Sequence, residues 1–315
     1  MAEVHEDLDP FGTGKLPSGR HGLSREVVVR SQRERMVESM ITVVAMKGYT
    51  ETTVADIIEV LEHWAPQGLQ EEWDNSGLCI GDSTTIVRGV LVCLDCTPEV
   101  LEEALADGLN MVISHHPLIF KGLKSLKDST PVERTVAAAV RGNMVVYSMH
   151  TNADKIMDGV SGAMARALKL KNLSILAPES CQEQDAAPCG LGVVGDLEYP
   201  MATKDFFAML KSTFALKHCK ASESFHSQVK RVALCGGNGS SLIPYALRSG
   251  ADIFVSADFS YHTYFETVPQ LMLADIGHYE SEAGVQDQIV NQLMKKFPNF
   301  AVRKTQVYTN PIRYY

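Results

Sequence analysis

The spacing of apolar residues along the chain predicts strands and helices in alternation. Residues 86–94 (IVRGVLVCL) form an apolar run that is typical of a buried strand. Helices and strands are then predicted in turn over 98–106, 110–114, 132–141, 144–148, 156–168, 191–196 and 203–214. The series ends with 231–235, a helix after Gly239, 253–256, 271–276, a helix over 281–296 and a strand near 301–308. Repeated β and α units predict an α/β protein with largely buried sheets.

The first fifty residues have a different pattern. Residues 1–23 are rich in Gly, Pro and charge, which predicts a mobile arm. A helix is predicted over 24–47, with Ser24 as its N-cap and Gly48 as its end. Its arginines make it a basic segment; they are Arg25, Arg30, Arg33 and Arg35. A second short helix is predicted over 53–63, and the polar stretch 177–188 is the best candidate for a join between two lobes.

Composition and charge narrow the class of protein. The chain has 315 residues, 45% hydrophobic and 21% charged, which excludes a disordered or collagen-like chain and predicts two domains or one with an appendage. The net charge of −9 argues against a dedicated nucleic-acid binder. Seven scattered cysteines argue against a disulfide scaffold. There is no membrane-spanning apolar run and no signal-peptide core, so a soluble, cytoplasmic protein is expected.

Histidines and carboxylates gather in three polar settings, each after a predicted strand. They are His115 and His116 in SHHP, His150 and Asp154 in HTNAD, and His278 and Glu282 in GHYESE. Because His278 and Glu282 are four residues apart, a helix would place them on one face. Strand ends are also where α/β folds place their ligand sites.

This combination of side chains indicates a metal site. Neutral imidazole with carboxylate is the ligand set expected for Zn, Mn, Fe or Ni rather than Ca or Mg. The simpler alternative is that each histidine is an ordinary polar residue near a loop. Three such clusters in one chain favour the metal site.

Three other features carry weaker signals. The pair Cys93 and Cys96 forms a CxxC at a strand end, which favours two buried thiols over a zinc ribbon. The loop 236–241 (GGNGSS) could hold a phosphate on its N–H groups or form a tight turn. Asp258 and His262 could line a pocket, or Asp258 could cap a helix.

Several motifs, in order, resemble those of one family. They are Trp64–Pro66, 72–78 (EWDNSGL), Leu94-Asp95, 114–120 (SHHPLIF), 150–154, the Asp258/His262 segment and 277–282. Together they resemble the GTP cyclohydrolase 1 type 2 homologues, also called Nif-three-like dimetal proteins, over about residues 54–315. The resemblance implies two α/β lobes with mixed sheets flanked by helices, after a helical extension over 1–53. Lobe 1 would span about 54–176 and 266–315, and lobe 2 about 189–265.

The resemblance also implies the contents of the site. Two divalent metal ions per chain would be held by His115, His116, Asp154, His278 and Glu282. Either carboxylate, Glu282 or Asp154, could bridge the ions. His150, Asp95 and His262 would be catalytic neighbours in the pocket, although the family often has His where Tyr261 stands. The family assembles as a homohexamer, a trimer of dimers.

A dinuclear site suggests hydrolysis. One metal lowers the pKa of bound water toward about 7, and the pair clamps the attacking and leaving oxygens. The substrate could be a nucleotide, as in GTP cyclohydrolase chemistry, or a phosphoester. The alternative from another class is a non-catalytic metal-binding ring that acts as a scaffold or regulator.

The N-terminal region suggests a third hypothesis. Residues 20–58 resemble the start of a TetR-type repressor, which would make the protein a DNA-binding regulator. Residues 60–66 (VLEHWAP) fit the dimetal family instead, so the recognition helix that reads the major groove is missing. The sequence therefore argues against specific DNA binding.

Overall fold

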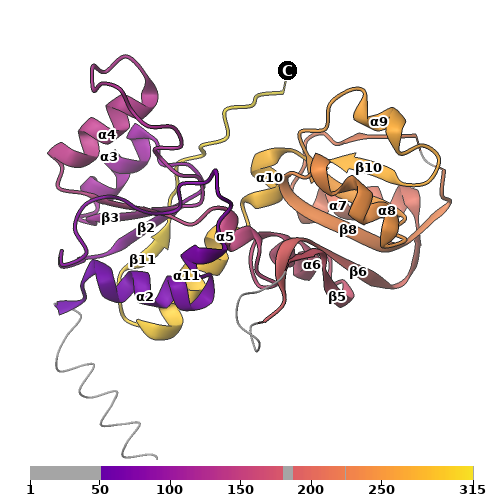
Figure 1. The fold of residues 1–315 in the computed structure, drawn as a ribbon, viewed down its shortest axis with the longest axis horizontal. Helices are drawn as coiled ribbons and strands as arrows, with labels where there is room; N and C mark the ends of the chain where they lie inside the picture. The colour runs from indigo at the N-terminus through magenta and orange to yellow at the C-terminus, as the bar shows by residue number, and fades with distance from the viewer. Residues whose placement is uncertain (1–50, 180–186, 224, 315) are drawn as a thin grey trace, which may run out of the picture. The chain divides into compact units, whose positions relative to one another are not determined.

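The computed structural model describes residues 51–179, 187–223 and 225–314. From residue 53 onward the chain forms a compact unit that contains two mixed sheets flanked by helices (Figure 1). The predicted α/β class, with two such sheets, is confirmed. The predicted arm over 1–23 and the basic helix over 24–47 lie outside the described residues.

The first sheet has five strands in the order β1-β4-β3-β2-β11. They are β1 (Gly77–Ile80), β2 (Val90–Cys93), β3 (Met111–Ser114), β4 (Val145–Ser148) and β11 (Val302–Lys304). Strands β2, β3, β4 and β11 run parallel, and β1 pairs antiparallel with β4. Because parallel strands end at one edge, the carboxyl ends of β2, β3 and β4 lie together.

Four helices cover the two faces of this sheet (Figure 1). They are α2 (Val54–Trp64) with α11 (Val285–Lys296) on one face, and α3 (Pro98–Ala106) with α4 (Pro131–Arg141) on the other. Both α3 and α4 begin with proline at the first turn behind a threonine N-cap, Thr97 or Thr130. Helix α2 begins with a capping box between Thr53 and Asp56. These local signals explain why the helix starts could be predicted.

The second sheet has six strands in the order β5-β6-β8-β9-β10-β7. They are β5 (Lys171–Glu179), β6 (Cys189–Ala202), β7 (Lys220–Ala221), β8 (Gln228–Asn238), β9 (Ile253–Ala257) and β10 (Met272–Asp275). Strands β8, β9 and β10 are parallel, and the other pairs are antiparallel.

Alternate residues of these strands build two hydrophobic cores. Val232, Val255 and Ala274 pack on the face covered by α6 (Val160–Ala167) and α7 (Thr203–Thr213). Their neighbours in sequence pack on the opposite face with α8 (Ile243–Arg248); they are Ala233, Phe254 and Leu273. The two-residue period of strands therefore separates the two cores.

Phe206 of α7 is fully buried in the first of these cores. Phe206→Ala is expected to lower the free energy of unfolding by about 3–5 kcal/mol, because the lost ring leaves a cavity. Urea denaturation measures this change. Phe265→Ala is the matched control, since Phe265 is 64% exposed. A loss at Phe206 no larger than that at Phe265 would contradict the placement of this core.

The structure differs from the predicted elements at several points. Of the stretch 177–188, residues 177–179 pair with β6 as the end of β5. Strands β5 and β10 belong to the second sheet, whereas the lobe boundaries put most of β5 and all of β10 in lobe 1. The helix expected over 281–296 is divided into α10 (His278–Glu282) and α11. Two short helices were not predicted; they are α5 (Thr151–Asp154) and α9 (Thr263–Glu266).

The described cysteines fit the exclusion of a disulfide scaffold. Five are free: Cys79, Cys93, Cys96, Cys219 and Cys235. Cys189 is disulfide-bonded, so the described cysteines comprise five free thiols and one bonded residue. Cys93 and Cys96 are both free and buried, so the CxxC is a pair of buried thiols. Burial raises the pKa of Cys96 to about 12.

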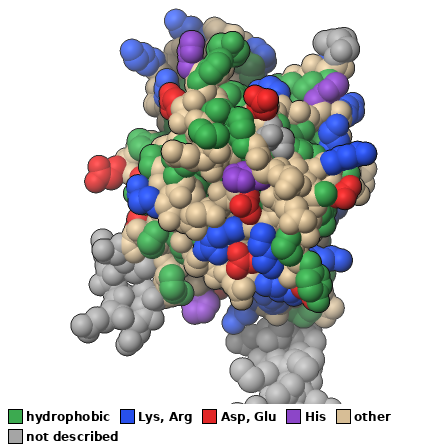
Figure 2. All heavy atoms as spheres, turned by 90° about the vertical axis from the view of Figure 1, so that its right-hand side faces the viewer, with side chains coloured by type: hydrophobic (Ala, Val, Ile, Leu, Met, Phe, Trp, Pro, Cys, Tyr) green, Lys and Arg blue, Asp and Glu red, His purple; other side chains and the backbone are tan. Residues whose placement is uncertain are grey.

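Two general surface features follow from the described residues. Among the described helices, none is long and apolar enough to cross a membrane. The face drawn in Figure 2 mixes Lys and Arg side chains with Asp and Glu side chains.

Candidate metal centre

The metal-ligand candidates converge where the ends of the first sheet meet α10. His115 and His116 directly follow β3, His150 follows β4, and Asp95 follows β2. Asp154 is the last residue of α5. Helix α10 begins at His278 and ends at Glu282, which places both residues on one face. The ends of β2, β3 and β4 together with α10 therefore bring together residues that are more than 180 positions apart in the chain.

Glu282 lies at the centre of this cluster. Its side chain is 4% exposed, and its Oε2 lies 3.0 Å from His116 Nε2 and 3.1 Å from His278 Nε2. Ligands bound to one ion at about 2.1 Å are themselves about 3–3.4 Å apart. These two distances therefore fit binding to a common ion.

The other oxygen of Glu282 faces a second set of ligands. Its Oε1 lies 3.9 Å from His115 Nε2, which in turn lies 3.7 Å from Asp154 Oδ1. The His115 side chain is fully buried. The two carboxylate oxygens of Glu282 thus point toward two different groups of candidate ligands.

His115 Nε2 and Asp154 Oδ1 are buried and lack a hydrogen-bond partner among the described residues. They lie 3.7 Å apart. Buried polar atoms are almost always paired, so two neighbouring unpaired atoms need an explanation. Both are good ligands for a divalent cation, and one such ion would satisfy them together. The residues present therefore fit a metal.

Hydrogen bonds on the far side of each ring orient the imidazoles. His115 Nδ1 lies 2.7 Å from the Met149 carbonyl oxygen, which can only accept, so Nδ1 donates, and in the neutral ring Nε2 carries the lone pair. His116 Nδ1 contacts Asp95 Oδ1 at 2.8 Å, and His278 Nδ1 contacts Asp258 Oδ2 at 2.6 Å. Metal-binding histidines typically use such partners to fix tautomer and ring orientation.

The charges of the cluster also favour a cation. Burial opposes protonation of His116, but Asp95 and Glu282 raise its pKa to about 10. Contact with Glu282 raises the pKa of His278 to about 9. Burial raises the pKa of Asp154, and the nearby imidazoles, His115 first among them, offset this only in part. The buried carboxylates are therefore stabilised by positive charge, which protons on the imidazoles or metal ions can supply.

Glycines at the end of β8 make room for Glu282. Gly237 has a φ of +61°, and a Cβ atom there would lie 2.3 Å from Glu282 Oε1. The Gly237 N–H donates to Ser281 Oγ at 2.9 Å, and the Gly236 N–H donates to Ser161 Oγ at 3.3 Å. These N–H groups are therefore occupied, which favours the tight-turn interpretation of the loop 236–241 over a phosphate site.

His150 belongs to the cluster as well, since its ring offers a nitrogen within 4.8 Å of those of His115 and His116. It also has a carboxylate of its own. Its ring centroid is 5.3 Å from that of His115 and 5.6 Å from that of His116. Its Nδ1 contacts Asp74 Oδ1 at 2.8 Å, and the Asp74 side chain is fully buried. Burial raises the pKa of Asp74, but hydrogen bonds from His150 and Thr151 outweigh this and hold it well below its ordinary value. Ionised Asp74 therefore fixes His150 with Nδ1–H facing the carboxylate.

The structure thus brings together most of the predicted site residues. The five candidate ligands and the neighbours His150 and Asp95 share one cluster. His262 does not join it among the described contacts, because it is exposed at the N-cap of α9 and packs against Tyr261. The expected role of that segment falls instead to Asp258. Sequence reasoning missed Asp74, although it lies inside the EWDNSGL motif.

Asp258 is expected to tune metal binding through His278. Asp258→Asn should weaken metal affinity by about 10- to 100-fold, because the imidazole loses its charged partner and its fixed orientation. Titration of the metal-free protein with Mn²⁺ by calorimetry measures the change. Glu266→Gln, an exposed carboxylate on α9, is the control. Equal affinity in the Asp258 variant and the control would contradict this role.

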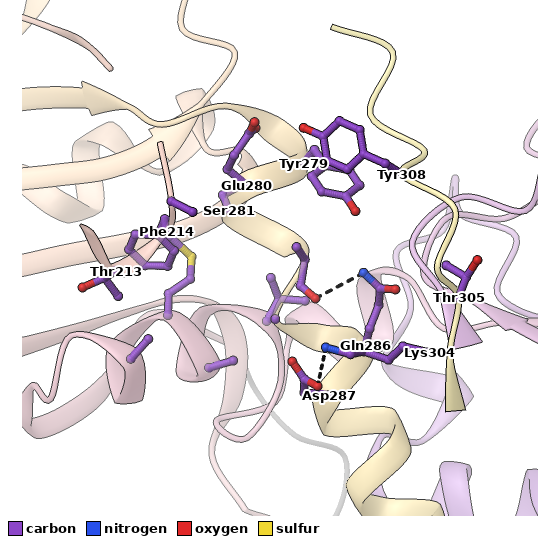
Figure 3. Close-up of a pocket in the computed structure, with 17 residues that line it drawn as sticks. Thr213, Phe214, Tyr279, Glu280, Ser281, Gln286, Asp287, Lys304, Thr305 and Tyr308 are labelled. Atoms are coloured by element: carbon purple, nitrogen blue, oxygen red, sulfur yellow. Dashed lines mark hydrogen bonds and ion pairs between the residues drawn. The ribbon is translucent and has the colours of Figure 1, made fainter. Parts of the chain in front are cut away.

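A separate cavity lies on the other face of α10 (Figure 3). It has a volume of about 480 Å³ and is lined by Tyr279, Glu280 and Ala283 rather than by His278 or Glu282. The Lys304–Asp287 ion pair, at 2.7 Å, lines it as well. The metal-ligand candidates and this cavity are therefore distinct features on opposite sides of one helix.

Comparisons with known proteins agree with this architecture. The chain is 31% identical over 231 residues to a Clostridium acetobutylicum protein named "GTP cyclohydrolase 1 type 2 homolog". The aligned region covers 73% of this chain and 85% of that protein. A Staphylococcus aureus protein of the same name is 26% identical, over 83% of this chain and 99% of the relative.

Solved structures show the same fold. The crystal structure of Staphylococcus aureus protein SA1388 superposes with a TM-score of 0.76 at 29% identity, over 84% of this chain and 100% of that one. A Bacillus cereus protein related to NIF3 gives a TM-score of 0.79 at 24% identity, over 84% and 100%. The family model Duf34/NIF3 (NGG1p interacting factor 3) matches residues 52–311, which leaves most of the TetR-like stretch outside the match. The chain therefore belongs to the Duf34/NIF3 family.

Proposed function

We propose that the protein is a divalent-metal-dependent hydrolase with a dinuclear centre. The observation that carries this proposal is the arrangement around Glu282, whose two oxygens face separate ligand sets. His116 and His278 would hold one ion, and His115 with Asp154 would hold the other. His116 Nε2 has only one lone pair and would serve one ion, whereas Glu282, with two oxygens, would help to hold both.

The metals would supply an activated water and a clamp on the attacking and leaving oxygens. The chain's own residues contribute orientation and proton transfer. Asp95 holds His116, and Asp258 holds His278, in the tautomers that present Nε2 to the cluster. His150 is 16% exposed, with ionised Asp74 behind Nδ1, so its Nε2 can exchange a proton with a bound substrate. The proposed acid–base residue is therefore His150 and not His262.

Turnover with defined metals tests this function. Protein loaded with Mn²⁺ or Zn²⁺ is expected to hydrolyse GTP or simple phosphoesters, and His116→Ala should abolish the rate together with metal binding. His150→Ala should keep its metal and lose about 100-fold or more in kcat, the typical effect of removing a general acid or base. Equal, negligible rates in wild type and His116→Ala would reject the hydrolase and favour the metal-binding scaffold. Assembly into a homohexamer stays a prediction, which light scattering can test.

A further inference from the structure

Two exposed aromatic rings stand directly beside the candidate metal centre. The ring centroids of Trp73 and Phe120 are 5.9 Å apart, at an interplanar angle of 62°. Both rings contact His150, with centroid distances of 6.0 Å from Trp73 and 6.3 Å from Phe120. A continuous series of ring contacts therefore leads from His115 and His116, through His150, to solvent.

Trp73 and Phe120 are exposed although their backbones are anchored. Trp73 is 60% exposed and Phe120 is 45% exposed. The residue after Trp73, Asp74, accepts hydrogen bonds from the Thr151 N–H and from Ser76 Oγ, both at 3.0 Å. Asn75 Nδ2 donates to the Ile119 carbonyl at 2.6 Å, which joins the Trp73 loop to the segment before Phe120. The chain next to both rings is thus anchored while the ring surfaces stay open, so less chain ordering is needed to bind a ligand.

The chemistry of the neighbourhood selects the kind of ligand. Large rings left in water favour stacking partners, and a planar heteroaromatic ring can stack on the face of Trp73. The three rings of Trp73, Phe120 and His150, which lie at steep angles to one another, can also bind an organic cation. Two metal ions close by would repel such a cation. The patch consists of two side chains, which is small for a protein interface. A small molecule with a flat ring and an anionic group therefore fits best.

We propose that Trp73 and Phe120 form a stacking subsite for a planar heteroaromatic ring, such as a purine, whose attached anionic group reaches the metal centre. The part of this proposal in which the anionic group reaches the metal centre rests on the proposed dinuclear function. Trp73 would supply the stacking face, and Phe120 would hold the edge of the Trp73 ring. His150 lies between the subsite and the candidate ligands, so the ring and the anionic group would bind on either side of it.

A matched pair of ligands tests the subsite without requiring turnover. GMP and ribose 5-phosphate share the ribose and the phosphate and differ in the purine. The chain has two tryptophans, so Trp64→Phe leaves Trp73 as the single tryptophan reporter. With Mn²⁺ bound, GMP is expected to quench Trp73 fluorescence, and ribose 5-phosphate is expected to bind without quenching it.

Calorimetry on variants then assigns the effect to the ring. Trp73→Ala should weaken GMP binding by about 5- to 100-fold and leave ribose 5-phosphate affinity unchanged, as expected for the loss of one stacked base. Tyr199→Ala is the matched control, because Tyr199 is 74% exposed on β6. It should change neither affinity.

Several outcomes would overturn the subsite. One is an equal loss of affinity for both ligands in Trp73→Ala, and another is the absence of GMP binding. Stronger Trp73-dependent binding of tetramethylammonium would show a cation site instead. A change in assembly mass with unchanged GMP affinity would show that Trp73 contacts a second copy of the chain. Because these are binding measurements, a failure of the hydrolase assay alone leaves the subsite standing.

Discussion

Glu282→Gln is expected to abolish tight metal binding at the whole centre. The substitution keeps the size of the side chain but removes the charge that lies 3.0 Å from His116 Nε2 and 3.1 Å from His278 Nε2. Since Glu282 also faces His115, both ligand sets lose the same carboxylate. The loss of Mn²⁺ affinity should exceed the roughly 10- to 100-fold effect typical of outer partners such as Asp258. Elemental analysis and calorimetry measure it.

Glu280→Gln provides the control on the same helix. Glu280 lies on the cavity side of α10, where its Oε1 accepts a hydrogen bond from Asn310 Nδ2 at 3.1 Å. This variant should bind Mn²⁺ like the wild type. If Glu282→Gln retained the metal content of Glu280→Gln, Glu282 would not be a ligand, and a centre bridged by its carboxylate would be wrong.

The fold could be predicted where local signals and burial agree. Helix α3 runs over 98–106 as predicted, because Thr97 and Pro98 mark its start and its apolar spacing marks its length. Strand β5 was missed because its first four residues are exposed or half-buried at the edge of the second sheet, so its sequence shows no apolar run. Its pairing with β6 is what makes it a strand, and that pairing is a tertiary interaction.

The candidate site, like the fold, could be predicted only in part. His115, His116, His278 and Glu282 were singled out because imidazole and carboxylate cluster at predicted strand ends. Their partners were harder to find because they come from distant segments. Asp74 is 76 residues from His150, and Asp258 is 20 residues from His278. His262 was chosen instead of Asp258 because residue type alone does not show which of the two faces the centre.

The close approach of Gly237 to Glu282 leads to a second large expected effect. Gly237→Ala should weaken Mn²⁺ affinity by at least about tenfold, the lower end of the range for outer-shell changes. The added Cβ would lie 2.3 Å from Glu282 Oε1 and 3.3 Å from His278 Cε1, so the carboxylate must move away from its present position. Calorimetry with Mn²⁺ measures the affinity, and urea denaturation of the metal-free protein measures the stability.

Gly250→Ala separates displacement of the carboxylate from backbone strain. Gly250 has a φ of +70°, close to the +61° of Gly237, and a Cβ there meets nothing within 4 Å. Both variants should therefore lose about 1–2 kcal/mol of stability from the left-handed backbone conformation. Only Gly237→Ala should also lose metal affinity, because only its methyl group contacts a proposed ligand. Equal metal affinity in the two variants would mean that the position of Glu282 is not what organises the centre.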